Sequence, residues 1–495
     1  MQNKSLLLGI DIGTSACKVA LFSDDGKVVA QENHEYNVFY PQHGWAEQNP
    51  YDWWDGVCVA LKTLLDINSI NPKDIVGIGI DGQSWSAIPI SEDGECLHNT
   101  PIWMDTRALE VCKELDAKIG EERIFEICGN PLQPAYTLPK ILWYKKHLPD
   151  VYDKADKILQ SNSYIVFKLT GAVTQDISQA YGLHCFDIRN GKWDYALCKE
   201  MGIKSSLLPE IYPCHAIVGK VTQLAARETG LCEGIPVVAG GLDAACGTLG
   251  AGVIRSGETQ EQGGQAGGFS ICTDSYSADP RLILSYHVVP DRWLLQGGTV
   301  GGGGVMKWLA AQLWQGSSYD ELGHAASSIP TGSDGVVFLP YMAGERSPIW
   351  DPDAKGVYYG LDYAKTHGHI IRASLEGTAF ALRHNLEVAE QAGAKVKRLR
   401  AMGGAANSKI WTQIKADITG KAIDVPYSDT ATTLGAAILA GVATGVYASF
   451  EEAVARTVKI TRSHEPNCDN AQVYKENYDT YLKLYERLKP IMHMR

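Results

Sequence analysis

The sequence contains no stretch of the ~18 consecutive apolar residues that a membrane-spanning helix needs. The apolar run after Met1-Gln2-Asn3-Lys4 is only a few residues long, too short for the hydrophobic core of a secretion signal. The 12 cysteines form no Cys-x-x-Cys pair, which excludes the usual zinc-binding spacing and a disulfide scaffold. We therefore expect free thiols, a cytoplasmic location and no membrane partner.

Basic residues are also in short supply, because 45 Lys and Arg face 57 Asp and Glu, giving a net charge of −12. This balance argues against nucleic acid as a partner. An anionic ligand must then be held locally, by a metal ion or by oriented backbone amides. The 495 residues exceed the ~250–300 that one hydrophobic core serves, so the sequence predicts two domains.

A glycine-containing turn near the N-terminus is the most informative local pattern. Apolar segments Leu6–Ile10 and Lys18–Phe22 flank the turn Asp11-Ile12-Gly13-Thr14-Ser15. The pattern predicts a β-hairpin whose tip offers amides and hydroxyls to an anion, with Asp11 placed to hold a cation-bound water. An ordinary hairpin is the alternative, because short glycine motifs produce many false matches.

Strands and helices alternate along the chain in two cycles, which favours an α/β fold over α+β. We expect the hinge between the cycles around Val253–Gly257. The first cycle is predicted from a helix at Tyr51–Ile67, a strand at Asp74–Asp81, mainly helical residues 108–170, and a strand at Pro236–Gly241. The second is predicted from a strand–turn–strand around Gly263–Gly268, helices at His369–Ala392 and Lys409–Thr419, and a strand at Arg398–Met402.

Two further glycine-rich turns call for an explanation alongside the first. Gly264–Gly267 is a second candidate phosphate turn, and Gly403–Ser408 precedes a helix where a nucleoside could lie against the backbone. Asp243 opens a helix just after Gly240-Gly241. It is either a helix cap or a general base facing a cleft, its anion stabilised by the helix dipole.

At this point the sequence resembles the FGGY family of carbohydrate kinases, in the actin/hexokinase-like superfamily, from Leu6 to about Tyr447. Any one of the motifs is weak, but seven in family order form a specific pattern. They are Gly9-Ile-Asp-Ile-Gly-Thr-Ser15, Gly44-Trp-Ala-Glu-Gln48, Trp103-Met-Asp-Thr-Arg107, Leu169-Thr-Gly171, Gly240-Gly-Leu-Asp-Ala244, Gly403-Gly-Ala405 and Thr433-Leu-Gly-Ala-Ala437.

The resemblance implies two ribonuclease-H-like (actin-like ATPase) domains, residues 1–253 and 254–495, closing a cleft on a sugar and MgATP. The first domain would hold the sugar and part of the phosphates, and the second the nucleotide. A homodimer is a candidate assembly. The implied residues are Asp243 as catalytic base; Gln83, Ser84, Trp85, Tyr136 and Asp243 at the sugar; Asp11 at Mg²⁺; Thr14, Ser15, Gly264 and Gln265 at the phosphates; and Gly403, Gly404, Ala405 and Asn407 at the adenosine.

The acceptor is expected to be a small sugar or polyol, first a ketopentose such as xylulose. Ribulose, erythritol and glycerol stay open, because xylulose kinases typically have Gln-Met-His-Gly where this chain has Gln83-Ser84-Trp85-Ser86. The second phosphate turn, Gly264-Gln265-Ala266-Gly267, lacks the hydroxyls of the usual Gly-Thr-Ser-Gly, so backbone amides must serve. From another class, an actin-like scaffold ATPase would use the phosphate turns but not Asp243.

Two other sets of charged residues are interpreted as structural rather than ligand-binding. Asp105 and Arg107 are interpreted as an ion pair inside the first domain rather than sugar contacts. Glu345-Arg346-Ser347 and Asp351 are interpreted as a solvated loop rather than nucleotide contacts.

Overall fold

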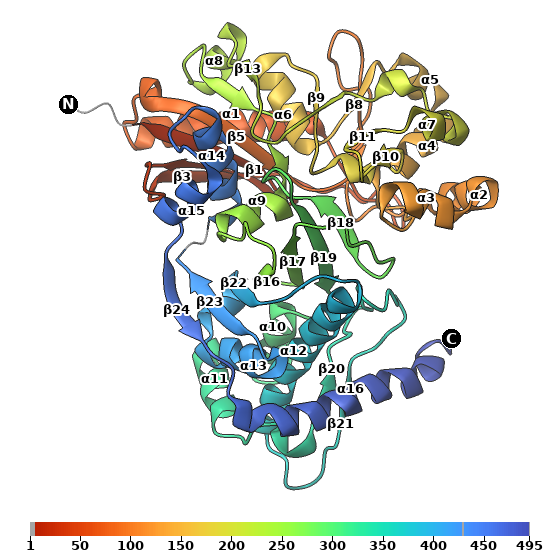
Figure 1. The fold of residues 1–495 in the computed structure, drawn as a ribbon, viewed down its shortest axis with the longest axis vertical. Coiled ribbons are helices and arrows are strands. Elements are labelled where there is room, and N and C mark those ends of the chain that lie inside the picture. The colour runs from red at the N-terminus through yellow and green to blue at the C-terminus, as the bar shows by residue number, and fades with distance from the viewer. Residues whose placement is uncertain (1–4, 428–429, 495) are drawn as a thin grey trace.

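The computed structural model describes residues 5–427 and 430–494, and it contains two seven-stranded sheets, one above the other in Figure 1. The first sheet has the order β13 (Ile217–Lys220), β14 (Pro236–Val238), β5 (Ile75–Gly82), β1 (Leu6–Ile12), β2 (Ala16–Phe22), β3 (Val28–Glu35), with β15 (Gly241–Leu242) also on β5. The second has the order β18 (Ile283–Tyr286), β19 (Trp293–Thr299), β17 (Gly267–Thr273), β16 (Glu258–Gly263), β22 (Arg398–Met402), β23 (Ala422–Pro426), β24 (Ile460–His464).

Each sheet joins an antiparallel meander to parallel strands. In the first, β1 pairs antiparallel with β2 and parallel with β5. In the second, β16 pairs antiparallel with β17 and parallel with β22. The sequence prediction of an α/β fold with two related units is therefore confirmed.

Helices cover the sheets because the central strands carry apolar side chains on both faces. All seven residues of β1 are buried. Helix α1 (Pro50–Ile67) packs on β2 and β3 and buries Trp53, Trp54, Val57 and Leu61. On the second sheet α12 (His367–Gln391) and α13 (Lys409–Thr419) pack together.

Helix α14 (Ala431–Ala443) belongs to the C-terminal half by sequence but packs against β1, β5 and α9 (Asp243–Gly250) of the N-terminal half. Glycines permit this contact: a Cβ added at Gly9 would meet the Thr433 carbonyl, and one at Gly79 would meet the Ala436 carbonyl. Figure 1 shows α14 and α15 (Phe450–Thr457) beside the upper sheet, after which the chain returns to the lower sheet as β24. The first core is therefore built from both ends of the chain.

The remaining elements flank this framework. The helices are α2 (Leu109–Ile119), α3 (Glu121–Cys128), α4 (Thr137–His147), α5 (Pro149–Lys154), α6 (Ser161–Thr170), α7 (Tyr195–Met201), α8 (Gln223–Thr229), α10 (Gly303–Gln312), α11 (Tyr319–Ser327) and α16 (Ala471–Met492). The short strand pairs are β4 (Glu47–Gln48) with β7 (Thr100–Pro101), β6 (Ile88–Ile90) with β8 (Lys157–Leu159), β9 (Thr174–Asp176) with β12 (Glu210–Tyr212), β10 (Phe186–Asp187) with β11 (Lys192–Trp193), and β20 (Val337–Leu339) with β21 (Val357–Tyr359).

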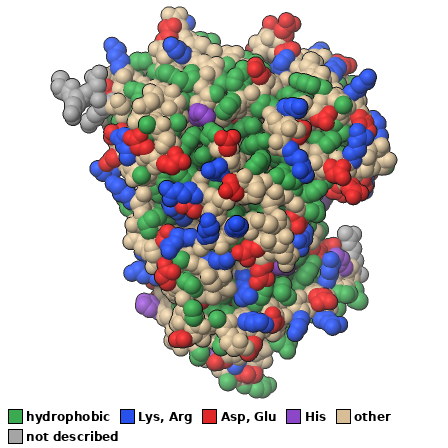
Figure 2. Space-filling view, viewed as in Figure 1, with side chains coloured by type: hydrophobic (Ala, Val, Ile, Leu, Met, Phe, Trp, Pro, Cys, Tyr) green, Lys and Arg blue, Asp and Glu red, His purple; other side chains and the backbone are tan. Residues whose placement is uncertain are grey.

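Acidic and basic side chains are interspersed over the face in Figure 2, without one large area of a single sign on that face. Among the described residues, no helix combines the length and apolar character that crossing a membrane requires.

Candidate functional site

A cleft of about 420 Å³ is lined by residues of both sheets and their connections. Its N-terminal wall carries the carboxylates, and its C-terminal wall combines glycines with uncharged side chains and one arginine. The first wall includes Asp11, Ser84, Trp85, Tyr181 and Asp243, and the second includes Gly267, Gly268, Gly297, Gly298 and Arg346.

Asp243 is the first residue of α9 and follows β15, which pairs with the end of β5. Its Oδ1 accepts a hydrogen bond of 2.6 Å from the N–H of Ala244, the next residue. Burial, and after it the Asp11 carboxylate, raise the pKa of Asp243 to about 7. A carboxyl group with a pKa close to neutrality, at a cleft, is suited to proton transfer.

Asp11 lies at the end of β1, and its carboxylate has one ion-pair contact, 3.9 Å from the Lys18 amine. Directly beside it in register on β5 stands Asp81, a buried acid that the sequence prediction did not include. Neither oxygen of Asp81 has a hydrogen-bond partner among the described residues. Burial, followed by the Asp11 charge, raises the pKa of Asp81 well above its ordinary value. An acid at the end of an otherwise apolar strand was the available signal.

The hairpin tip is braced from behind. The Thr14 hydroxyl donates to the Gln83 amide oxygen (3.3 Å) and accepts from the Trp103 indole (2.9 Å). Gln83 in turn donates to the Gln48 amide oxygen at 2.7 Å and is buried. Thr14, Gln83 and the exposed Ser15 are therefore not among the residues that line the cleft.

Aromatic rings form the wall next to Asp243. Trp85 lies against Tyr136 with ring centroids 4.3 Å apart, and against Tyr181 at 6.1 Å. Tyr136 is buried behind Trp85, whereas Tyr181 lines the cleft beside Ser84. Sequence reasoning missed Tyr181, since nothing near it in the sequence marks it as a pocket residue.

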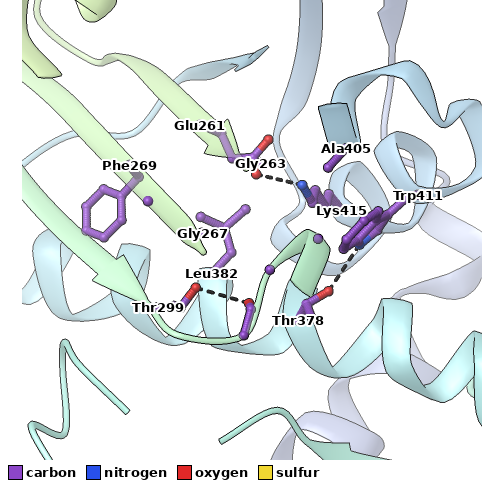
Figure 3. Close-up of a pocket in the computed structure, with 14 residues that line it drawn as sticks. Glu261, Gly263, Gly267, Phe269, Thr299, Thr378, Leu382, Ala405, Trp411 and Lys415 are labelled. Carbon is purple, nitrogen blue, oxygen red and sulfur yellow. Dashed lines mark hydrogen bonds and ion pairs between the residues drawn. The ribbon is translucent and has the colours of Figure 1, made fainter. Parts of the chain in front are cut away.

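The second glycine turn connects β16 to β17 and is held by the start of α10. The Gly303 N–H donates to the Gly264 carbonyl (2.8 Å), and the Gly304 N–H donates to the Gln265 carbonyl (2.9 Å). Figure 3 shows the small cavity beside this turn, where the Lys415 amine pairs with the Glu261 carboxylate at 2.6 Å. A buried ion pair thus supports a turn made largely of backbone.

A second pocket, of about 940 Å³, is lined in part by Gly264 and Gln265 of the glycine turn. It brings together several predicted nucleotide residues from distant segments, namely Gly264, Gln265, Gly404, Ala405 and Asn407. Gly403, directly before Gly404, has a φ of 79°, a backbone conformation that favours glycine. The pocket also includes Tyr319 and His324 of α11, which the sequence did not single out.

The prediction of a solvated loop around residue 346 is wrong. Glu345 is buried and accepts from the Val300 N–H at 2.6 Å, while Asp351 accepts from the Tyr485 hydroxyl at 2.8 Å. Arg346 lines the cleft and has no ion-pair partner among the described residues. Glu345 and Asp351 are therefore buried and accept hydrogen bonds from segments far away in the sequence.

The predicted ion pair inside the first half is confirmed. Arg107 Nη2 contacts Asp105 at 2.8 Å and also Glu47 at 2.7 Å, with its side chain fully buried. The guanidinium lies 3.9 Å from the Trp45 ring centre. Two of the sequence motifs, Gly44–Gln48 and Trp103–Arg107, therefore meet in one structural network.

The chain matches the FGGY family of carbohydrate kinases over residues 6–250 (N-terminal domain) and 273–444 (C-terminal domain). It is 31% identical to the xylulose kinase of Bacillus subtilis (strain 168), over 98% of this chain and 97% of the relative. It is 30% identical to the gluconokinase of the same organism, over 98% and 96%.

A solved structure, the xylulose kinase from Rhodospirillum rubrum, superimposes with a TM-score of 0.92 at 30% identity, covering 99% of this chain and 100% of that one. The fold is accordingly that of the sugar kinases with an actin-like ATPase architecture. The family matches agree with a cleft that is lined by residues of both sheets and by the Asp243 carboxylate. This chain belongs to the FGGY family of carbohydrate kinases and is an ATP-dependent phosphotransferase with an alcohol group as acceptor.

Proposed function

We propose that the acceptor is a small ketose, with xylulose as the first candidate, bound in the cleft beside Asp243. One observation carries this proposal: the cleft combines Asp243, a carboxyl group with a pKa of about 7, with neutral and aromatic side chains. These are Ser84, Trp85 and Tyr181. The relatives named xylulose kinase support a ketopentose. Ribulose, erythritol and glycerol are the other acceptors to compare.

A sugar acid is a second candidate. Arg346 lines the same cleft without an ion-pair partner among the described residues, and a guanidinium binds a carboxylate well. One of the relatives is named gluconokinase.

Asp243 would act as the general base. One of its oxygens accepts the Ala244 N–H, and the other makes no hydrogen bond within the described part of the chain. That second oxygen would take the proton of the acceptor hydroxyl as the hydroxyl oxygen attacks the terminal phosphorus of ATP. The bond between that phosphorus and ADP breaks in the same transfer.

Asp11 would hold a hydrated Mg²⁺. Its carboxylate lines the cleft, and its ion-pair contact with Lys18 is long. When bound, Mg²⁺ neutralises charge on the phosphates. We expect Asp11→Asn to weaken Mn²⁺ binding about tenfold or more, measured by electron paramagnetic resonance without turnover; tenfold corresponds to ~1.4 kcal/mol. Unchanged Mn²⁺ binding would exclude this role.

The glycine turns would hold the nucleotide. Backbone amides of the Gly264–Gly267 turn, including Gly264 and Gln265, would meet the phosphates, assisted by Thr14 and Ser15 if the hairpin rearranges on binding. Gly403, Gly404, Ala405 and Asn407 would lie against the adenosine, because most of them line the larger pocket.

Three further predictions concern the whole protein. The boundary between the two family domains is proposed at residues 253/254, inside the connection from α9 to β16. A homodimer is the proposed assembly, which light scattering coupled to size-exclusion chromatography tests. A cytoplasmic location is proposed because all 12 cysteines are free thiols.

The deciding experiment is ADP release measured by a coupled assay across pentuloses, hexuloses, polyols and aldonates. We expect strong stimulation by a ketopentose and slow ATP hydrolysis without an acceptor. A larger kcat/KM for gluconate would favour the sugar-acid candidate. The absence of stimulation by every neutral sugar would overturn the ketose proposal.

A further inference from the structure

Trp85 adopts a backbone conformation that a bulky residue rarely takes. Its φ is 62°, in the left-handed region, and such a conformation costs about 1–3 kcal/mol at a non-glycine residue. The ring nevertheless has a defined place, because a Cβ at Gly182 would lie 2.8 Å from Trp85 Cδ1. Something in the fold must therefore hold this residue in its conformation.

The Lys140 side chain contacts the backbone of Trp85 directly. Its Nζ donates to the Trp85 carbonyl at 2.9 Å and to the Ile102 carbonyl at 2.8 Å. Lys140 is completely buried, and no ion pair joins it to a carboxylate among the described residues. A buried amine whose bonds go only to backbone carbonyls fixes the course of those two segments, and it costs free energy if either bond is lost.

Helix α4 and the residue before it therefore contact Trp85 at two points, the ring and the backbone carbonyl. Tyr136, immediately before the helix, lies against the indole ring, and Lys140 within the helix binds the carbonyl. The second acceptor, Ile102, precedes Trp103, whose indole donates to the Thr14 hydroxyl of the hairpin tip. Lys140 thus connects the aromatic wall to a segment that braces the hairpin.

Burial also lowers the pKa of the Lys140 amine to about 7. Burial of an amine destabilises the folded protein, whereas a methionine of similar volume at this position would not. The need to hold the two carbonyls in place accounts for the amine.

We propose that Lys140 is a positioning residue of the acceptor site: by binding the Trp85 carbonyl, it sets the indole wall against which the sugar lies. The inference rests on the proposed binding of the acceptor beside Trp85. Lys140 itself does not line the cleft, so its effect on the sugar must pass through Trp85.

The test is Lys140→Met, which removes the donors and keeps the approximate volume. We expect the KM for the best sugar of the panel to rise about tenfold. The KM for ATP should change by less than about twofold, because the hairpin tip keeps the hydrogen bonds that join Thr14 to Gln83 and Gln48. Lys140→Arg, which retains donors, should recover part of the loss. Lys146→Met is the matched control, since Lys146 lies on the same helix, is exposed and pairs with Glu114.

A double-mutant cycle with Trp85→Ala separates positioning from general packing. If Lys140 acts through Trp85, adding Lys140→Met to Trp85→Ala should raise the sugar KM no further. Additive losses, or equal increases in the sugar and ATP KM values, would identify Lys140 as a packing residue and overturn the proposal. ATP-analogue binding by calorimetry verifies that each variant is folded.

The cycle also distinguishes the two proposals. An unchanged sugar KM in Trp85→Ala would overturn the placement of the acceptor, and with it the inference on Lys140. An impaired Trp85→Ala beside an unaffected Lys140→Met would overturn the role of Lys140 alone.

Discussion

The two walls of the cleft offer a substrate different kinds of chemical group. On the N-terminal side, carboxyl, hydroxyl and aromatic side chains face the cavity, among them Asp243 and Trp85. On the C-terminal side, the glycines Gly267, Gly268 and Gly297 expose backbone beside uncharged side chains such as Gln260 and Gln296. The N-terminal wall should therefore be sensitive to the removal of side-chain atoms, and the glycine positions of the C-terminal wall to the addition of a Cβ.

The division fits the physics of phosphoryl transfer. An acceptor hydroxyl needs a base in one defined position, which a side chain supplies. Phosphate oxygens need many donors at close range, which a backbone without Cβ atoms supplies. Arg346 is a charged side chain that lines the cleft from the C-terminal half.

The largest effect is expected on the side-chain wall. Asp243→Asn should reduce kcat by ~10²–10⁴-fold, the usual contribution of a positioned general base, with ATP binding nearly unchanged. Steady-state kinetics and calorimetry with ATP measure the two quantities. Wild-type turnover in this variant would leave Asp243 only a structural role at the start of α9.

The pH profile should show the same carboxyl group. Burial and then Asp11 raise the pKa of Asp243 to about 7, and the base acts only when deprotonated. Below that pH, kcat/KM should fall about tenfold per unit, and above it the profile should level off. Asp11→Asn removes one of the two causes, so residual activity in that variant should titrate at lower pH. An identical apparent pKa in both enzymes would contradict this coupling.

The phosphate turn at Gly264–Gly267 should respond to a single methyl group. A Cβ at Gly302 would lie 2.5 Å from the carbonyl carbon of Ala266, so Gly302→Ala must displace the phosphate turn. Overpacking of this kind costs about 1–3 kcal/mol, and we expect the KM for ATP to rise about fivefold. The sugar KM serves as the internal control and should stay constant. An unaltered ATP KM would mean that the turn does not hold the nucleotide.

The smallest effect concerns stability rather than rate. Asp81 is a buried acid whose folded-state pKa lies well above the ordinary 3.8, so the folded protein keeps a proton that the unfolded chain releases. Stability contributed by such a group declines as pH rises above the unfolded value. Asp81→Asn should therefore raise the unfolding free energy by about 1 kcal/mol near pH 8 and by less near pH 4. Urea titrations at both pH values measure this, and a uniformly destabilised variant would contradict it.

Local patterns were sufficient for the elements themselves. The helix predicted at Lys409–Thr419 has those bounds in the structure, and the apolar runs around Asp11 form β1 and β2, each longer than predicted. Helix caps, alternating apolar residues and glycine turns act over a few residues, so a sequence displays them directly.

What the sequence could not indicate depends on contacts between distant segments. Glu261 and Lys415 are 154 positions apart, and each is compatible with burial only because the other is there. Tyr181 and Arg346 reach the cleft from different halves. Charged residues around Glu345 were expected in solvent because their type is usually exposed, whereas Glu345 is buried and one of its carboxylate oxygens accepts from the Val300 amide.

The packing of α14 onto the first sheet affects how the chain folds during its synthesis. Residues such as Ala436 and Ala437 share a buried cluster with Leu7 and Phe22, so a nascent chain that has just completed β15 lacks one cover of its central strands. That surface stays uncovered while almost two hundred further residues are synthesised, until α14 emerges. During translation the N-terminal half therefore depends on α14, from the C-terminal part of the chain, to cover its sheet. A break near residue 253 would release a fragment with an uncovered apolar sheet.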